Sequence, residues 1–291
     1  MRRSVLVLLT ALGPAPLAAQ GLFYEGGMSA ATGRYIFTDR TTSWGIATGL
    51  AVGSSRITFR AALPVYLQNS TLISVSSPGG GLPTGGSASG VVADSTAARK
   101  GREGGGRGPA AGVAAAASPV EVPSSAVTGY KTALGDPTMQ VAWRAIDGGG
   151  TGVTASLLAK APVADTATFG TGEWDVGAGL AVNRWIGRSL VVGLDATYWH
   201  LGDMPTLSFR DPVSGTANIT YYGAGGWGGG LSVSASTSAL ETYAGPAWVG
   251  AHLVRNSERG GWGLNAALGL TETTPDVSVG LTWRVRLAGG G

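Results

Sequence analysis

The chain has 291 residues, of which 50 are glycine and none is cysteine, and only 13% are charged. Without cysteine, neither disulfides nor thiolate-bound metals can hold the fold. Setting aside Arg2 and Arg3 leaves 18 basic and 17 acidic residues, a net charge of +1, so the composition offers no argument for nucleic-acid binding. A charged fraction this far below the usual value of about 25% suits strands that place one face in lipid.

The first twenty residues have the order of charge and hydrophobicity that is typical of a secretory signal peptide. Arg2 and Arg3 precede an apolar run at residues 5–12, and Ala18 and Ala19 provide small residues for cleavage. We therefore expect residues 1–20 to be a signal peptide and the protein to be exported. No later stretch reaches the roughly 20 apolar residues that a spanning helix needs. If the protein crosses a membrane, a closed β-barrel is the structure that can satisfy its backbone.

Residues 173–199 alternate apolar and polar side chains with a period of two, in two consecutive runs. In the first run Trp174, Val176 and Leu180 share one face, and Asp175 and the glycines share the other. Successive side chains of a strand point to opposite faces of a sheet. Alternating segments of about ten residues separated by turns are typical of a transmembrane β-barrel, although a β-sandwich hairpin has the same local pattern.

The same pattern predicts about twelve antiparallel strands, and the fold class is therefore an all-β transmembrane barrel over residues 21–287. The first strand lies somewhere within residues 26–38. The others cover roughly residues 44–52, 56–67, 137–146, 151–161, 173–184, 189–200, 217–225, 229–240, 247–255, 261–271 and 277–287.

The connections between these strands separate the barrel reading from the sandwich reading. Every second connection is short, at residues 53–55, 147–150, 185–188, 226–228 and 256–260, and the others are mostly longer. Outer-membrane barrels have short periplasmic turns and longer extracellular loops. We therefore expect a barrel in the outer membrane of a Gram-negative cell, with the lipid bilayer, lipopolysaccharide and the barrel assembly machinery as its partners.

Residues 68–136 form the longest predicted connection and differ in composition from the rest of the chain. They are rich in Gly, Ala, Ser and Pro and carry a basic patch at residues 99–107. This composition cannot supply a hydrophobic core, so we expect a long, loosely packed extracellular loop. A plug inserted in the barrel and a basic loop that touches lipopolysaccharide phosphates are the alternatives. Residues 288–291 are expected to be a Gly-rich tail.

The polar face of the predicted strands carries charges of both signs. A narrow barrel can fill itself with ion pairs, or rings of charged side chains can set the selectivity of a passage, and both can hold together. The candidates for lining the lumen are Arg60, Arg144, Lys160, Asp175, Asp195, Arg284 and Arg286.

The sequence predicts no catalytic centre, no metal site and no cofactor. The only histidines are His200, on the lipid-side parity of its strand, and His252, on the lumen side. A hydrolase needs a nucleophile, a base and an orienting partner within hydrogen-bond reach, and no serine lies in a Gly-x-Ser-x-Gly elbow. An outer-membrane hydrolase is therefore disfavoured.

Several short motifs occur in an order that resembles a known family. Lys160-Ala161-Pro162 ends one strand, Gly170-Thr171-Gly172 and Glu173 begin the next, Gly135-Asp136-Pro137 precedes another, and Thr274-Pro275-Asp276 precedes the last. This order resembles the outer-membrane transporters grouped as the MetA-pathway of phenol degradation family. Two features depart from the family pattern, since only Asp165 matches its Thr-Gly-Asp and the last strand lacks a terminal aromatic residue.

The resemblance implies a barrel that passes hydrophobic or aromatic compounds. Together with the polar lumen face, it predicts a channel for passive passage of a small, hydrophobic or aromatic solute. The alternative is a structural or adhesive barrel that acts through its long extracellular loop.

Overall fold

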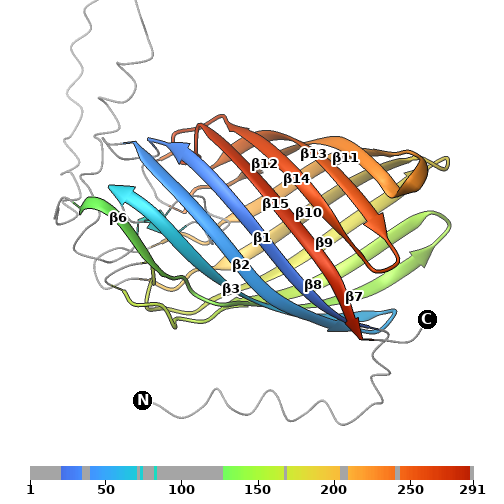
Figure 1. The fold of residues 1–291 in the computed structure, drawn as a ribbon, viewed down its shortest axis with the longest axis horizontal. Helices are drawn as coiled ribbons and strands as arrows, with labels where there is room; N and C mark the ends of the chain where they lie inside the picture. The colour runs from blue at the N-terminus through green and yellow to red at the C-terminus, as the bar shows by residue number, and fades with distance from the viewer. Residues whose placement is uncertain are drawn as a thin grey trace, which may run out of the picture.

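The computed structural model describes residues 21–34, 40–70, 73–74, 82–83, 127–166, 169–203, 209–239 and 243–288. One sheet holds nearly all of its strands, and Figure 1 shows them tilted around a common axis. These strands are β1 (Gly21–Gly33), β2 (Thr41–Gly53), β3 (Ile57–Ser70), β6 (Val127–Leu134), β7 (Thr138–Gly148), β8 (Thr151–Lys160), β9 (Asp175–Ile186), β10 (Leu190–His200), β11 (Val213–Tyr222), β12 (Trp227–Ser236), β13 (Ala247–Ser257), β14 (Gly260–Gly269) and β15 (Val277–Ala288).

The sheet closes on itself as a twelve-stranded antiparallel barrel, as predicted. Strand β1 pairs with β2 on one side and with β15 on the other, β2 pairs with β3, and from β7 to β15 each strand pairs with the next one in sequence. β6 and β7 together count as one strand of the barrel, because both pair with the same strand. β7 pairs with the first half of β3, and β6 pairs with its second half. A separate pair, β4 (Ile73–Ser74) and β5 (Leu82–Pro83), lies outside this sheet.

The outer face of the barrel is apolar and exposed. Leu157, Leu194 and Leu231 are each more than half exposed, and far more large apolar side chains are exposed than buried in the described residues. In a soluble protein an exposed apolar surface of this extent would be a liability, whereas around a closed barrel it is the band that lipid covers. The chain is therefore an outer-membrane β-barrel.

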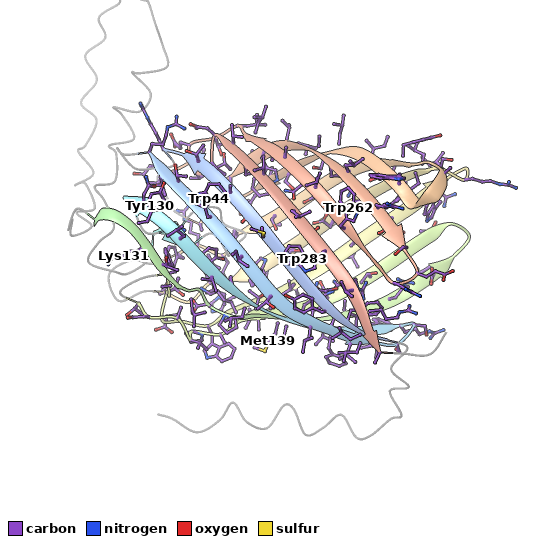
Figure 2. The ribbon with its side chains drawn as sticks, viewed as in Figure 1. Trp44, Tyr130, Lys131, Met139, Trp262 and Trp283 are labelled. Atoms are coloured by element: carbon purple, nitrogen blue, oxygen red, sulfur yellow. The ribbon has the colours of Figure 1, made fainter. Side chains whose placement is uncertain are left out.

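Tryptophans mark both edges of this apolar band. Figure 2 shows Trp44 toward one end of the barrel wall, with Trp262 and Trp283 farther toward the other. Trp44 is three residues from the start of β2, and Trp262 is two residues from the start of β14, where the chain runs the opposite way. Such girdles at the two interfaces are typical of outer-membrane barrels.

The connections sort by length in the structure, as the sequence predicts. The turns that follow β2, β7, β9, β11 and β13 are short, and the one after β11 holds a single 3-10 turn, η1 (Ala224–Gly226). The start of β1 and the end of β15 lie at this same end of the barrel, at the right in Figure 1. This end faces the periplasm, and the opposite end is extracellular.

Several predicted boundaries are wrong, among them the start of the strand predicted at residues 217–225, which begins at Val213. The first strand starts at Gly21 rather than at residue 26, and the last strand includes Ala288, which we had assigned to the tail. The predicted loop 68–136 is shorter, because β3 continues to Ser70 and β6 returns along it from Val127. The signal peptide at 1–20, the basic patch at 99–107 and residues 289–291 lie outside the described residues.

Among the described residues, no helix is long and apolar enough to cross a membrane.

Candidate functional site in the barrel lumen

The extracellular half of the lumen contains a cavity of about 500 Å³, which we call the extracellular cavity. Its wall comes mainly from inward-facing small residues of β1, β2, β14 and β15, together with Tyr66 of β3 and Trp248 of β13. Because glycine, alanine and serine fill so little of the interior, these strands leave free space where bulkier inward residues would fill a barrel of this size. Hydroxyl groups and two aromatic rings therefore face the same space.

The periplasmic half contains a second cavity, of about 560 Å³, which we call the periplasmic cavity. Phe23, Glu25, Arg284 and Arg286 line it, and Glu258 of the β13–β14 turn stands at its rim. Thr282 belongs to the walls of both cavities. The inward face of β15 thus leads from Ser278 through Thr282 to the two arginines, so the lining changes from small and neutral to cationic along one strand.

Glu25, Arg60, Arg284 and Arg286 form what we call the arginine cluster. Glu25 Oε1 lies 3.3 Å from Arg284 Nε, and Glu25 Oε2 lies 3.4 Å from Arg60 Nε. Arg60 Nη1 also donates to Gln140 Oε1 at 3.2 Å. The Glu25 carboxylate therefore bridges two guanidinium groups, with one oxygen toward each. Arg286 adds a third positive charge nearby.

The ring of Phe23 fixes how the two arginines of β15 are presented. The Arg284 guanidinium carbon lies 3.7 Å from the Phe23 ring centroid, and that of Arg286 lies 5.4 Å from it. A guanidinium that stacks on an aromatic face keeps the N–H donors of its edge free for anions. The stacking therefore orients the cations without using their donors.

A small residue on the intervening strand allows the arginine cluster to form. β2 lies between β1 and β3, and its Ala51 is the register partner of both Phe23 and Arg60. Ala51 is fully buried, which shows that the long side chains on either side cover it. A larger residue there would separate Glu25 from Arg60.

Lys160 and Asp175 face inward at the extracellular ends of β8 and β9, but both are buried. Lys160 is 2% exposed, and its Nζ lies 2.7 Å from Asp175 Oδ2 and 3.4 Å from Asp136 Oδ2. The same Nζ donates to Thr171 Oγ1 at 2.7 Å. We call Asp136, Lys160, Thr171 and Asp175 the buried lysine network, and its charges are covered rather than presented to a passing solute.

Backbone donors complete this network and bind three connections together. Asp136 Oδ1 accepts hydrogen bonds from the N–H groups of Val163 and Ala164, and Asp175 Oδ1 accepts one from Gly202. Since buried charges are tolerated only when they are paired and hydrogen-bonded, these bonds explain how one lysine can neutralise two aspartates. The β6–β7 junction, the β8–β9 connection and the β10–β11 connection are thereby held against the barrel.

Three of the motifs that resemble the phenol-degradation family, those that contain Asp136, Lys160 and Thr171, meet at this network. Thr171 supplies a hydroxyl to Lys160, and its two glycine neighbours are required by the backbone. A Cβ at Gly170 would collide with the carbonyl oxygen of Ala164, and Gly172 has a φ of +78°, which L side chains rarely adopt. Phe169, which directly precedes Gly170, is buried edge-on against Tyr66, with ring centroids 5.5 Å apart.

The structure places the two remaining lining candidates apart from both groups. Asp195 lies in the middle of β10, where its register partner on β11 is Thr216. Arg144, near the periplasmic end of β7, is half exposed and pairs with Asp147 at 3.0 Å. Of the seven candidates, the structure thus brings together Arg60, Arg284 and Arg286 in one group and Lys160 and Asp175 in another.

Three residues of these two groups, and Phe23 beside them, were missing from the predicted set. Phe23 and Glu25 were missed because the first strand was predicted to begin after them. Asp136 and Thr171 were visible as members of short motifs, but spacing alone gave them no role. The motif glycines beside Thr171 were the available signal.

Within the described residues, each histidine has one partner of a catalytic triad and lacks the other. His200 Nδ1 lies 3.1 Å from both oxygens of Asp211 on the outer rim, with no serine or threonine hydroxyl bonded to its ring. His252 Nε2 lies 2.9 Å from Thr220 Oγ1 in the lumen, with no carboxylate bonded to its ring.

The Tyr198 hydroxyl, and then His200, hold the pKa of Asp211 below its ordinary value.

No family model and no curated protein matches the sequence. Among solved structures, an outer membrane channel from Pseudomonas putida F1 is similar, with a TM-score of 0.62 and 10% identity over 95% of this chain and 100% of that one. The NanC porin has a TM-score of 0.47 at 8% identity, over 92% of this chain and 99% of its own. The Ralstonia pickettii toluene transporter TbuX has a TM-score of 0.42 at 10% identity, over 92% of this chain and 90% of its own. The first of these likenesses shows that the chain has the fold of an outer-membrane channel.

Proposed function

We propose that this protein is an outer-membrane channel for passive passage of a small, hydrophobic or aromatic solute. The observation that carries the proposal is the pair of cavities inside the barrel whose walls share Thr282. Their combined walls run from the extracellular half to the periplasmic half of β15. A barrel that served only as a scaffold would have no reason to keep this space free of side chains.

The lining suits a solute with an apolar body. Tyr66, Trp248, Pro64 and Pro275 contribute apolar surface to the extracellular cavity, and the hydroxyls of Ser29, Ser43 and Ser278 stand among them. Ligand pockets are commonly apolar with a few placed polar groups, in a volume of about 300–1,000 Å³. Membership of the phenol-degradation transporters, which the motifs suggest, is part of this proposal.

The test is uptake of a small neutral aromatic, benzyl alcohol, into proteoliposomes, together with conductance in planar bilayers. We expect both to exceed the protein-free background. Ser278→Trp should slow uptake because Ser278 lines the extracellular cavity. The matched control is Val279→Trp, one residue away on the lipid-exposed face, which should leave uptake unchanged.

If neither ions nor benzyl alcohol cross, or if both tryptophan variants behave alike, the channel proposal fails. The structural or adhesive barrel, acting through its long extracellular connection, would then be the better account.

A further inference from the structure

The arginine cluster has donors that the protein itself leaves unused. Both oxygens of Glu25 lie at Nε atoms, and the terminal amino groups of Arg284 and the whole guanidinium of Arg286 have no ion-pair partner among the described residues. Side-chain exposure of 40% keeps Arg284 accessible from the lumen. The guanidinium groups of Arg284 and Arg286, both stacked on the Phe23 ring, therefore offer unpaired donors to the periplasmic cavity.

The charges facing the periplasmic cavity favour an anion. Arg284 and Arg286 line the cavity, and Arg60, which lies behind Glu25, adds a third positive charge, against the carboxylates of Glu25 and the exposed rim residue Glu258. Guanidinium forks match the two oxygens of a carboxylate, and charge-assisted bonds of this kind are about twice as strong as neutral ones. The cavity is thus equipped to hold one carboxylate.

The second cavity indicates what the rest of the ligand would be. The extracellular cavity begins at Thr282, next along the inward face from Arg284, and is lined by Tyr66 and Trp248 with small residues between them. An aromatic body of modest size could occupy that space while its charged group reached the arginines.

We propose that the preferred solutes are small organic anions, aromatic carboxylates of the benzoate class, which the arginine cluster binds on their way to the periplasm. This inference rests on the proposed channel function and adds its substrate class. Phe23 and Glu25 act as positioning residues, since they orient the guanidinium groups and leave their outer donors free.

The test compares benzoate with benzamide, its neutral near-isostere, in proteoliposome uptake at low salt. We expect benzoate to enter about tenfold faster, because clefts lined by one sign of charge raise the rate for the opposite ion by about that factor or more. In about 1 M salt the preference should shrink, because the Debye length falls from about 10 Å to about 3 Å.

Three variants connect the preference to the named residues. Arg284→Ala/Arg286→Ala should bring the ratio of benzoate to benzamide uptake close to one. Arg286→Ala alone should lower the ratio while keeping both ion pairs of Glu25, so it guards against a folding defect in the double variant. The control is Arg184→Ala, which removes an arginine at the same end of the barrel, where it bonds to Thr151 on the outer face. It should keep the wild-type ratio.

Equal uptake of benzoate and benzamide by the wild type, or a ratio that Arg286→Ala leaves unchanged, would overturn this inference and leave the channel standing. If neither compound enters, the channel proposal itself fails. A fall in the ratio caused equally by Arg184→Ala would also count against the arginine cluster, because it would point to the overall charge of the barrel.

Discussion

Replacing Lys160 with methionine should destabilise the barrel more than any other single change of charge in the described residues. Lys160 is 2% exposed and lies within 3.4 Å of two carboxylates. Methionine preserves most of the volume but leaves Asp136 and Asp175 buried without a cation. Removing one partner of a buried ion pair costs about 3–5 kcal/mol, because the remaining charge is left uncompensated.

The expected loss is large enough to measure, since every 1.4 kcal/mol changes an equilibrium constant about tenfold. Urea unfolding of the barrel in lipid vesicles, followed by tryptophan fluorescence, would report it. The band that shifts on heating in gels gives a second measure of the folded fraction. Arg144→Met is the matched control, because its pair with Asp147 is half exposed and such pairs contribute about 0–1 kcal/mol.

A second substitution separates lost charge from lost packing. Adding Asp175→Asn to Lys160→Met removes one of the two stranded carboxylates, so the double variant should be more stable than Lys160→Met alone. If Lys160→Met costs no more than Arg144→Met, the buried lysine network does not hold the connections as we describe. If the double variant is less stable still, packing rather than charge is the cause.

Three further changes test other parts of the structure. Leu157→Lys on the outer face should lower the free energy of unfolding in vesicles by about 2–4 kcal/mol if the side chain lies at mid-membrane. A loss below about 0.5 kcal/mol, which is usual for exposed positions of soluble proteins, would contradict the lipid-facing assignment. Gly170→Ala should cost about 1–3 kcal/mol through its collision with Ala164, whereas Gly148→Ala, which meets nothing within 4 Å, should be nearly neutral. The lowered pKa of Asp211 means that its bonds to Tyr198 and His200 stabilise the folded state above the ordinary carboxyl pKa, and that this is lost as the pH falls through the lowered value. Tyr198→Phe should therefore raise the Asp211 pKa in a carbon-13 titration of the side-chain carboxyl, and an unchanged pKa would remove the hydroxyl as its main cause.

Period-two alternation predicted the strands, and the sorting of short and long connections then predicted a barrel rather than a sandwich. The pattern failed for β6, whose sequence Val127–Leu134 contains charged Lys131 and a glycine, Gly129, at a φ of +105°. β6 is held by pairing with β3 far away in sequence, and no local pattern reports such a pairing. A strand that depends on a distant partner was therefore assigned to the loop.

Parity predicts that Lys160 and Asp175 share the inner face, and in the structure the two residues are register partners. It could not show that the β8–β9 connection covers them, because covering is a property of tertiary structure. Glu25 was lost for a different reason. The first strand follows directly after the predicted cleavage region, and a start five residues too late removed the one carboxylate that organises the arginines.

The distinction between covered and accessible charges changes the electrostatics of the lumen. Counted from the sequence, Lys160 and Asp175 belong to the same mixed lining as the arginines. In the structure, their opposite charges lie 2.7 Å apart under a connection, so they present little field to a solute. The accessible charge is concentrated instead at the periplasmic half, where Arg60 and Arg284 share Glu25 and Arg286 adds a further positive charge. A solute would therefore meet a neutral, partly aromatic space first and a cationic one afterwards, and that order favours an amphipathic anion over either a sugar or a cation.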